Sequence, residues 1–439
     1  MPIKPVAARH STTEPAQAAP VPRQAQKPLS PSDLVDSLIQ EALVRRASDV
    51  HLEPNESGLL VRFRVHGDLQ NMMVIPTDDR AAVVSRIKIM ANLNIAEHRL
   101  PQDGRIRLRR NGHAVDVRVS TMPSLHGEKV VLRLLDLDGV SIPLDNIGLR
   151  DDHLRKLRHL IAKPQGIIFV TGPTGSGKTS TIYAALNEIK SEKNNIITIE
   201  DPIEYEMSGV TQIAVHEKIG LTFATCLRSV LRQDPDVLLV GEVRDQETAR
   251  IAMQASLTGH LVFATLHTNG ALGAITRLLE MGIPPYLIAS SLSGILAQRL
   301  VQVLCPDCKV PAKHDAKLLA RLGPAAAKMF QRGPGCERCR GVGAVARVGV
   351  FELVTMTTEL RALIVKQASE AELRHLVSTG ENLHSMFLDG LTKVIDGRVA
   401  YDELVQVTEP DRNWLDGQQI QVTARPTLTT PSLTIVPPD

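Results

Sequence analysis

Residues 172–179 constrain this chain more than any other segment. They read Gly-Pro-Thr-Gly-Ser-Gly-Lys-Thr and match the pattern G-x-x-x-x-G-K-[ST] of a phosphate-binding loop. Residues 166–171, which precede the loop, are apolar and β-branched, as in a short buried strand. Residues 179–189, which follow it, place their apolar side chains on one helical face. The sequence therefore predicts that the loop joins a strand to a helix.

Each part of this loop has a chemical reason. Glycines let backbone N–H groups approach a phosphate because no Cβ intervenes. The N-terminus of the following helix adds unpaired N–H groups and the positive end of its dipole. Lys178 is predicted to reach the β- and γ-phosphates, and the Thr179 hydroxyl to bind Mg²⁺. The predicted ATP-binding residues are Gly172, Pro173, Thr174, Gly175, Ser176, Gly177, Lys178, Thr179 and Ser180.

Composition narrows the class of protein. A chain of 439 residues predicts two or three domains. Lys and Arg number 50 and Asp and Glu number 48, so the charge balance gives no reason to expect nucleic-acid binding. No stretch reaches the ~18 apolar residues of a transmembrane helix, and the N-terminus lacks a secretory signal, so a cytoplasmic location is predicted. Five cysteines in such a chain indicate metal binding or free thiols.

The first part of the chain predicts a small α+β domain. Residues 1–29 are rich in Pro, Ala and Gln and are predicted to be a disordered lead. Ser30 and Pro31 are typical of a helix start. Alternating strand patterns follow at 61–65, 105–109 and 115–120, with a hairpin turn at Asn111-Gly112. We therefore expect a domain over residues 30–137 with a basic sheet face, and a linker over 138–147.

The second part predicts an α/β fold. Strand patterns at 166–171, 195–200, 236–240 and 261–266 alternate with helical patterns. This rhythm is typical of a mostly parallel sheet with helices on both faces. We expect the second domain over 148–407, with small helices over its residues 358–405. Residues 408–439 are predicted to be a flexible tail.

Acidic residues follow two of these strands. Glu200, Asp201 and Glu204 come after one, and Glu242 after another. Ligands of open α/β sheets collect beyond the C-terminal strand ends, so these acids are predicted to converge on the γ-phosphate and its Mg²⁺. Thr179, Glu200 and Asp201 are the predicted Mg²⁺ ligands, and Glu242 and Glu204 the predicted catalytic acids. The alternative is that they are solvated surface acids.

Two histidines flank the strand at 261–266. His267 follows it, at the same sheet edge as the acids, and is predicted to sense the γ-phosphate. The alternative is an ordinary structural histidine. His260, before the strand, is a further candidate.

Four cysteines form two C-x₂-C pairs, Cys305 with Cys308 and Cys336 with Cys339. Each pair aims two thiolates at one point, and two pairs complete a tetrahedral Zn²⁺ shell. Four thiolates leave no open position, so the predicted zinc is structural, in a lobe over 305–339. The alternative is four unrelated thiols. Cys226 is predicted to be a buried apolar residue.

Together these motifs resemble the type II secretion and type IV pilus assembly ATPase family. The resemblance covers residues 31–407 and rests on six segments. They are the phosphate loop, the aspartate box at 198–205, the Walker B region at 232–242, the histidine box at 258–269, and the N-terminal markers at 48–54 and 102–105. The resemblance implies a RecA-like P-loop NTPase core, a PAS-like N-terminal domain and a homo-hexameric motor ATPase.

The resemblance also implies how the two domains cooperate. ATP would lie between them, and arginines of the N-terminal sheet would complete the pocket. Arg105 and Arg118 become candidate arginine fingers, with Arg62, Arg64 and Arg133 as further candidates. The alternative is a solvated strand face.

The cysteine pairs indicate the secretion or pilus-extension branch of the family. The implied partners are inner-membrane platform and assembly proteins, with peripheral membrane association through them and no direct nucleic-acid contact. Many secretion members carry a folded N-terminal docking domain, and residues 1–29 are too short and too polar to form one.

Two other functions remain open. A DNA-uptake or DNA-translocating P-loop ATPase would need an electropositive channel, which the charge balance and sparse aromatics do not favour. A non-hydrolysing scaffold would use nucleotide and zinc only for folding. The acids and His267 argue against it.

Overall fold

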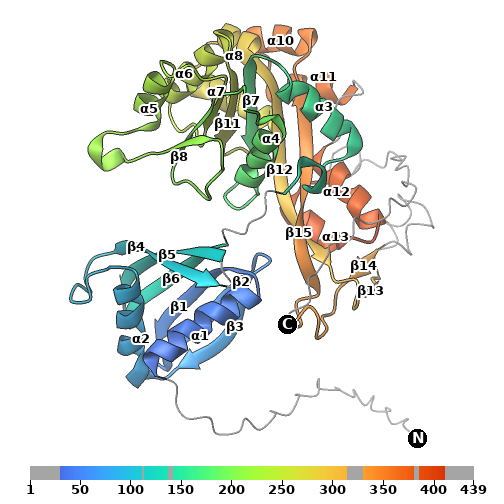
Figure 1. Ribbon diagram of the computed structural model, residues 1–439. Helices are drawn as coiled ribbons and strands as arrows, with labels where there is room; N and C mark the ends of the chain where they lie inside the picture. Colours follow the sequence, from blue (N-terminus) through green and yellow to red (C-terminus); the bar gives the residue numbers. More distant parts are fainter. Residues whose placement is uncertain (1–29, 111–112, 137–141, 314–329, 380–384, 411–439) are drawn as a thin grey trace, which may run out of the picture.

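The computed structural model describes residues 30–110, 113–136, 142–313, 330–379 and 385–410 (Figure 1). The predicted lead at 1–29, the predicted turn at 111–112, the start of the linker and most of the tail lie outside the described residues. We call residues 30–136 the first lobe and residues 142–410 the second lobe. Among the described residues, no helix has both the length and the apolarity that crossing a bilayer requires.

The first lobe begins at the predicted helix start. The Ser30 hydroxyl accepts a hydrogen bond from the Asp33 amide at 3.2 Å, and Pro31 is the first residue of α1. The elements of this lobe are α1 (Pro31–Val44), β1 (Ala47–Asn55), β2 (Gly58–Val65), β3 (Asp68–Ile75), α2 (Thr77–Met90), β4 (Gln102–Arg110), β5 (His113–Ser124) and β6 (Gly127–Asp136). The predicted strand patterns lie within β2, β4 and β5.

Six antiparallel strands form the sheet of the first lobe, in the order β3-β2-β1-β6-β5-β4. Alternate residues of β2, such as Val61 and Phe63, are buried beneath α1 and α2, which cover one face (Figure 1). The residues between them, Arg62 and Arg64, point to the opposite face. That face is free of helices and carries the basic side chains.

The second lobe contains a seven-stranded sheet in the order β15-β12-β7-β11-β10-β8-β9. All neighbours are parallel except β12 and β15. The strands are β7 (Gly166–Thr171), β8 (Ile196–Glu200), β9 (Thr211–Ala214), β10 (Val237–Val240), β11 (Leu261–Leu266), β12 (Leu292–Leu304) and β15 (Ala344–Thr355). The four predicted strands are β7, β8, β10 and β11, and the predicted α/β fold class is confirmed.

Helices cover both faces of this sheet. Ile168 and Val170 of β7 pack with α3 (Asp151–Ile161) and α4 (Lys178–Ile189) on one face. Ile167 and Phe169 pack on the other face, with the remaining helices. These are α5 (Phe223–Val230), α6 (Gln246–Leu257), α7 (Ala271–Glu280), α8 (Pro285–Ser291), α10 (Thr358–Val365), α11 (Glu370–Thr379), α12 (Met386–Ile395) and α13 (Tyr401–Val407). Short 3₁₀ turns lie at η1 (Leu144–Asn146) and η2 (Glu217–Ile219).

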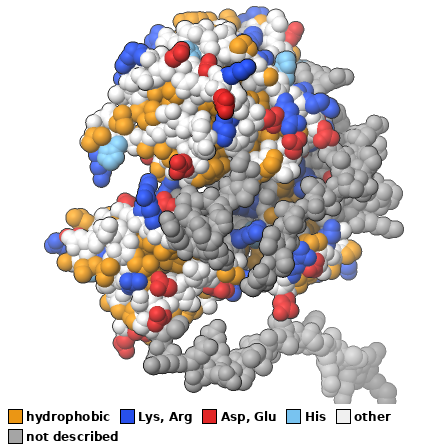
Figure 2. Space-filling model, in the orientation of Figure 1, with side chains coloured by type: hydrophobic (Ala, Val, Ile, Leu, Met, Phe, Trp, Pro, Cys, Tyr) orange, Lys and Arg blue, Asp and Glu red, His pale blue; other side chains and the backbone are white. Residues whose placement is uncertain are grey.

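Several contacts between described residues join the lobes, including an ion pair at 3.9 Å between Glu41 of α1 and Arg340. Arg118 of β5 donates a hydrogen bond to the Ile203 carbonyl at 2.8 Å. Gln302 of β12 donates from Nε2 to Asp68 Oδ2 at 2.8 Å and to the His66 carbonyl at 3.1 Å. Figure 2 shows acidic and basic side chains facing each other where the lobes meet. The helix-free face of the first lobe is thereby directed toward the second.

Candidate active site

The phosphate-binding loop lies between β7 and α4, as predicted. Gly172 has a φ of 152° and Gly177 a φ of 85°, both in the region that favours glycine. A Cβ at Gly172 would lie 2.5 Å from the Gln298 carbonyl oxygen, so only glycine fits there. Thr179 lies in the first turn of α4, at the helix end where N–H groups are unpaired.

Two side chains fix this loop. Lys178 Nζ donates to the carbonyls of Gly172 at 2.8 Å and Pro173 at 3.0 Å. Gln298, on β12, donates from Nε2 to the Ser176 carbonyl at 2.7 Å. Burial lowers the pKa of Lys178, Glu242 opposes this shift and Arg299 reinforces it. Since Glu242 affects the pKa of Lys178, the two charged groups lie near each other, at the same edge of the sheet.

Glu242 follows β10 and is held on both sides. Its Oε2 accepts a hydrogen bond from Arg244 Nε at 2.7 Å, and its Oε1 lies 3.2 Å from His267 Nε2. Burial lowers the pKa of His267, and Lys178 lowers it further. His267 is therefore neutral at neutral pH, with its Nε2 close to the Glu242 carboxylate. Glu242 and His267 thus meet at the predicted edge, whereas His260 lies at the other end of β11, with Nδ1 2.9 Å from the Ala255 carbonyl.

The other predicted acids lie in two environments. We call residues 201–210, between β8 and β9, the acidic loop. Asp201 is exposed, 3.6 Å from Arg244, and Glu204 lies 3.3 Å from Arg118. Glu200, before the loop, is 4% exposed, and both its carboxylate oxygens accept hydrogen bonds from protein side chains. The structure therefore separates Glu200 from the exposed acids with which the sequence groups it.

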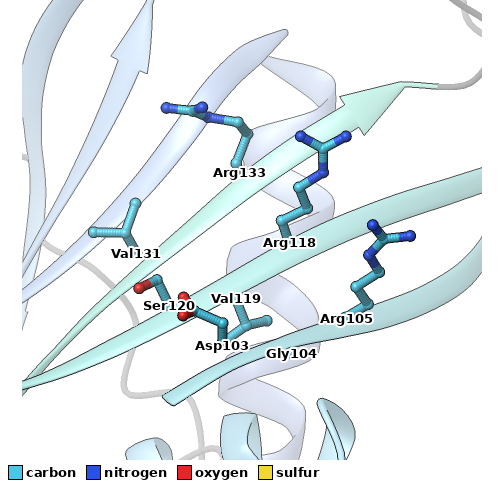
Figure 3. A pocket seen from close by; sticks show the side chains of 8 residues that line it. All are labelled: Asp103, Gly104, Arg105, Arg118, Val119, Ser120, Val131 and Arg133. Atoms are coloured by element: carbon cyan, nitrogen blue, oxygen red, sulfur yellow. The ribbon is translucent and has the colours of Figure 1, made fainter. Parts of the chain in front are cut away.

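The candidate arginines form one row across the first sheet. Arg105 of β4 is opposite Arg118 of β5, which is opposite Arg133 of β6. Together with Asp103 and Ser120 they line a hollow of about 510 Å³ (Figure 3). Arg118 faces the acidic loop, and burial lowers its pKa while Glu204 opposes the shift.

The two remaining candidate fingers lie farther along the same face. Arg62 pairs with Glu53 at 2.7 Å, and Arg64 lies 4.0 Å from Asp49. Arg133, in the row above, also pairs with Asp49, at 2.9 Å. Among the described residues, Arg118 is thus the candidate finger with a polar contact to the second lobe.

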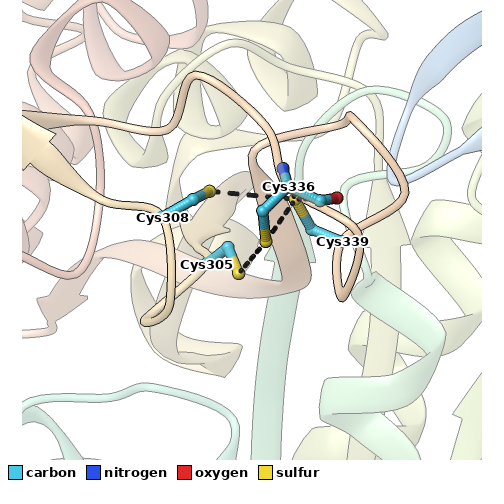
Figure 4. Close-up of side chains that lie close together, drawn as sticks. All are labelled: Cys305, Cys308, Cys336 and Cys339. Carbon is cyan, nitrogen blue, oxygen red and sulfur yellow. Dashed lines mark hydrogen bonds between the residues drawn. The ribbon is translucent and has the colours of Figure 1, made fainter.

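The four cysteines converge on one point (Figure 4). Their sulfurs lie within 4.8 Å of one another, with separations of 3.8 Å for Cys305–Cys336 and Cys308–Cys339 and 3.6 Å for Cys336–Cys339. Tetrahedral Zn²⁺ with Zn–S bonds of about 2.3 Å requires sulfurs about 3.8 Å apart, so this donor set fits zinc.

Backbone donors support the same sulfur cluster. Burial raises the pKa of Cys339, but the amides of Cys336 and Gly343 donate to its sulfur and bring that pKa to about 6. This stabilises the thiolate form that binds a metal. Cys226, a residue of α5, is buried in the core, as predicted.

The structure also adds residues that the sequence analysis missed. Arg244 lies two positions after Glu242, in the loop between β10 and α6, and a basic residue so close to a candidate catalytic acid could have indicated a pair. Gln298 is a lone buried amide in an apolar strand, and a buried polar residue is itself a signal. Tyr183 and Gln212 gave no signal, because their partners are distant in the sequence.

The fold and the site together define a P-loop NTPase of the RecA-like class with an N-terminal sheet domain. Residues 24–406 match the family described as "Type II/IV secretion system protein". The chain belongs to this family, and the predicted family is confirmed.

Curated relatives support the same assignment. "Type II secretion system protein E" of Pseudomonas aeruginosa is 49% identical over 381 residues, which is 86% of this chain and 75% of that protein. "Type II secretion system ATPase E" of Vibrio cholerae is 49% identical over 380 residues, 86% of this chain and 75% of that protein.

Solved structures share the fold. The pilus retraction motor PilT with bound ADP aligns with a TM-score of 0.58 and 26% identity, covering 87% of this chain and 98% of that one. The Legionella pneumophila ATPase DotB aligns with a TM-score of 0.65 and 21% identity, covering 88% of this chain and 97% of that one.

Proposed function

We propose that this protein is a hexameric cytoplasmic motor ATPase that powers type II secretion or type IV pilus-like assembly at the inner membrane. Inner-membrane platform and assembly proteins would be its partners. The predicted class of enzyme, an ATPase, is confirmed by the family and by the relative named as an ATPase. The names of the relatives support the secretion branch, and the cysteine cluster agrees with it.

We assign the following roles to the site. Residues 172–180 hold the phosphates of ATP, with Lys178 at the β- and γ-phosphates. Mg²⁺, when bound by Thr179 and Asp201, neutralises phosphate charge. Glu242 and Glu204 orient the attacking water, and His267, 3.2 Å from Glu242, supports the position of that carboxylate. Arg118 and Arg105 stabilise charge that develops on the γ-phosphate. Zinc, held by the four cysteines, supplies folding energy to the 305–339 lobe.

One observation carries the proposal. Lys178 and Glu242 come from two motifs more than sixty residues apart, yet the charge of Glu242 reaches Lys178 and raises its pKa against the effect of burial. Activation of water for hydrolysis requires a carboxylate held near the phosphate-binding lysine. Here Arg244 and neutral His267 flank that carboxylate.

Steady-state ATP hydrolysis by the full chain tests the proposal. Lys178→Ala should abolish turnover, and Glu242→Gln should abolish turnover while it still binds ATP. Arg374→Ala, which removes an exposed pair with Glu370 on α11, is the matched control and should hydrolyse like the wild type. Wild-type turnover in Lys178→Ala would reject the proposed site.

The ring is tested separately. Sedimentation of the full chain with Mg²⁺ and a non-hydrolysable ATP analogue should give the mass of six chains. A monomer at every concentration would reject the hexamer.

A further inference from the structure

A single side chain, Gln212, organises the inside of the acidic loop. It lies on β9, opposite Thr198 of β8. Its amide oxygen accepts from the Met207 amide at 2.7 Å, and its Nε2 donates to the Tyr205 carbonyl at 3.1 Å. Because the Met207 amide can only donate, this contact fixes which end of the Gln212 amide is oxygen. Gln212 thus holds two backbone groups of the loop from within.

The same amide connects the loop to the phosphate-binding helix. Gln212 Nε2 lies 3.2 Å from Glu200 Oε1 and 3.2 Å from the Tyr183 hydroxyl. Tyr183 is fully buried in α4, five residues after Lys178, and its hydroxyl donates to Glu200 Oε2. The ring of Tyr183 packs edge-on against Tyr205, with centroids 4.6 Å apart. The loop is therefore attached to the helix that begins at the phosphate-binding lysine.

Three side chains hydrogen-bond the Glu200 carboxylate, two at Oε1 and one at Oε2, and its burial keeps it away from the exposed side where a metal would bind. Its Oε1 also accepts from the Thr198 hydroxyl at 2.6 Å, and the side chain is 4% exposed. A buried carboxylate whose oxygens are hydrogen-bonded by Tyr, Thr and Gln is a structural anchor. Asp201, the next residue, is exposed and faces the site instead.

The outer side of the loop contacts the first lobe. Arg118 donates to the Ile203 carbonyl at 2.8 Å and lies 3.3 Å from Glu204. The inner side of the loop is therefore set by α4, and the outer side presents Glu204 to the arginine of the other lobe.

We propose that Gln212, Tyr183 and Glu200 are positioning residues that hold the acidic loop on the phosphate-binding helix, so that Glu204 and Arg118 meet in the geometry that hydrolysis requires. Glu200 thereby acts through the loop and is not a Mg²⁺ ligand, which replaces the role that the sequence predicted for it. This inference rests on the proposed ATPase function.

Kinetics of three variants in the full chain test the inference. Gln212→Ala and Tyr183→Phe should lower kcat at least ~10-fold, since a misplacement of about 1 Å can cost about 100-fold. Their KM for ATP should stay within about twofold of the wild type, because the contacts within the phosphate-binding loop are untouched. In Glu200→Gln, the half-saturating Mg²⁺ concentration should stay within about twofold.

Controls separate positioning from stability. Gln246→Ala removes a comparable amide contact, with the Gly282 carbonyl at 2.9 Å, at an exposed site and should keep wild-type kcat. Tyr183→Phe removes one oxygen and keeps the packing, and its thermal unfolding and binding of a fluorescent ATP analogue report whether it is folded. Wild-type kcat in both Gln212→Ala and Tyr183→Phe would overturn the inference, as would a ~10-fold rise in half-saturating Mg²⁺ for Glu200→Gln. Absence of turnover in the wild-type chain would instead reject the proposed function.

Discussion

Replacing Gln298 with leucine should loosen the phosphate-binding loop by an amount that the structure defines. Gln298 is 1% exposed, and its Nε2 supplies a donor to the buried Ser176 carbonyl at 2.7 Å. Leucine has nearly the same size but no donor. The substitution therefore leaves the carbonyl unsatisfied while the strand packing is retained.

The magnitude follows from two opposing terms. A buried carbonyl without a donor costs about 1–3 kcal/mol. Among the described residues, Gln298 Oε1 is buried and accepts no hydrogen bond. Leucine has no such oxygen, so the substitution also removes an unfavourable buried group and offsets part of the loss. We expect a net loss of about 1–1.5 kcal/mol, which lowers Tm by roughly 2–6 °C for a domain of this size. The KM for ATP should rise severalfold, because the loop is no longer held in its binding geometry.

Thermal unfolding followed by circular dichroism, together with ATP kinetics, measures both effects. Gln246→Leu is the control, since Gln246 is exposed and its loss should change stability by less than about 0.5 kcal/mol. A Gln298→Leu protein with the Tm and KM of the wild type would refute the argument that β12 supports the loop.

Three other predictions follow from the same structure. Arg118→Ala should lower kcat about 10³-fold, as loss of an arginine finger does, in steady-state assays; a change below about threefold would remove Arg118 from the mechanism. Cys305→Ser should lower the zinc content measured by elemental analysis and destabilise the 305–339 lobe; undiminished zinc would contradict the four-cysteine site. Burial lowers the pKa of His51, His66 and His267 below the ordinary 6.5. Below about pH 6.5 the unfolded chain therefore binds more protons than the folded chain, and the free energy of unfolding falls as the pH drops. Above about pH 7 these histidines are neutral in both states and do not affect stability. Tm should accordingly decline between about pH 7 and pH 5, and less steeply in His66→Asn; equal slopes would exclude His66.

Local patterns were sufficient for much of the fold. The strands at 166–171 and 261–266 are short, apolar and bounded by polar residues, and the structure gives them the predicted limits. The two C-x₂-C pairs likewise carry their geometry in their spacing, and their sulfurs converge. The phosphate-binding loop belongs to the same group, because its glycines and its place before a helix are local features.

The strand β12 shows what local patterns miss. Its sequence mixes Leu, Ala and Gln, which favour helices, with a buried polar residue in the middle. It is a strand because β7 and β15 pair with it on both sides, and every paired residue of these two strands lies at least forty positions away in the chain. The role of Gln298 depends on that pairing and was therefore absent from the sequence analysis.

The acids show a different limit. Glu200 and Asp201 are adjacent, and the sequence assigns both to Mg²⁺. Glu200, at the end of β8, points into the layer beneath α4, and Asp201 opens to the site. Successive residues of extended backbone face opposite sides, so the sequence alone could have predicted that Glu200 and Asp201 point in opposite directions. Which of the two residues faces the site depends on the side of the sheet on which α4 packs. That packing is part of the tertiary structure and cannot be derived from the local sequence.

The strand β12 also joins the three motifs that the sequence presents separately. Gln298 contacts the phosphate-binding loop, and Gln302, four residues later on the same side of the strand, contacts His66 and Asp68 of the first lobe. Cys305 follows directly at the end of the strand. Four residues of strand span about 13 Å, so one rigid element contacts the nucleotide loop, the arginine-bearing lobe and the cysteine cluster. Because these contacts lie on one strand, a change in the register of β12 would alter the phosphate-binding loop, the contact with the first lobe and the position of Cys305 together.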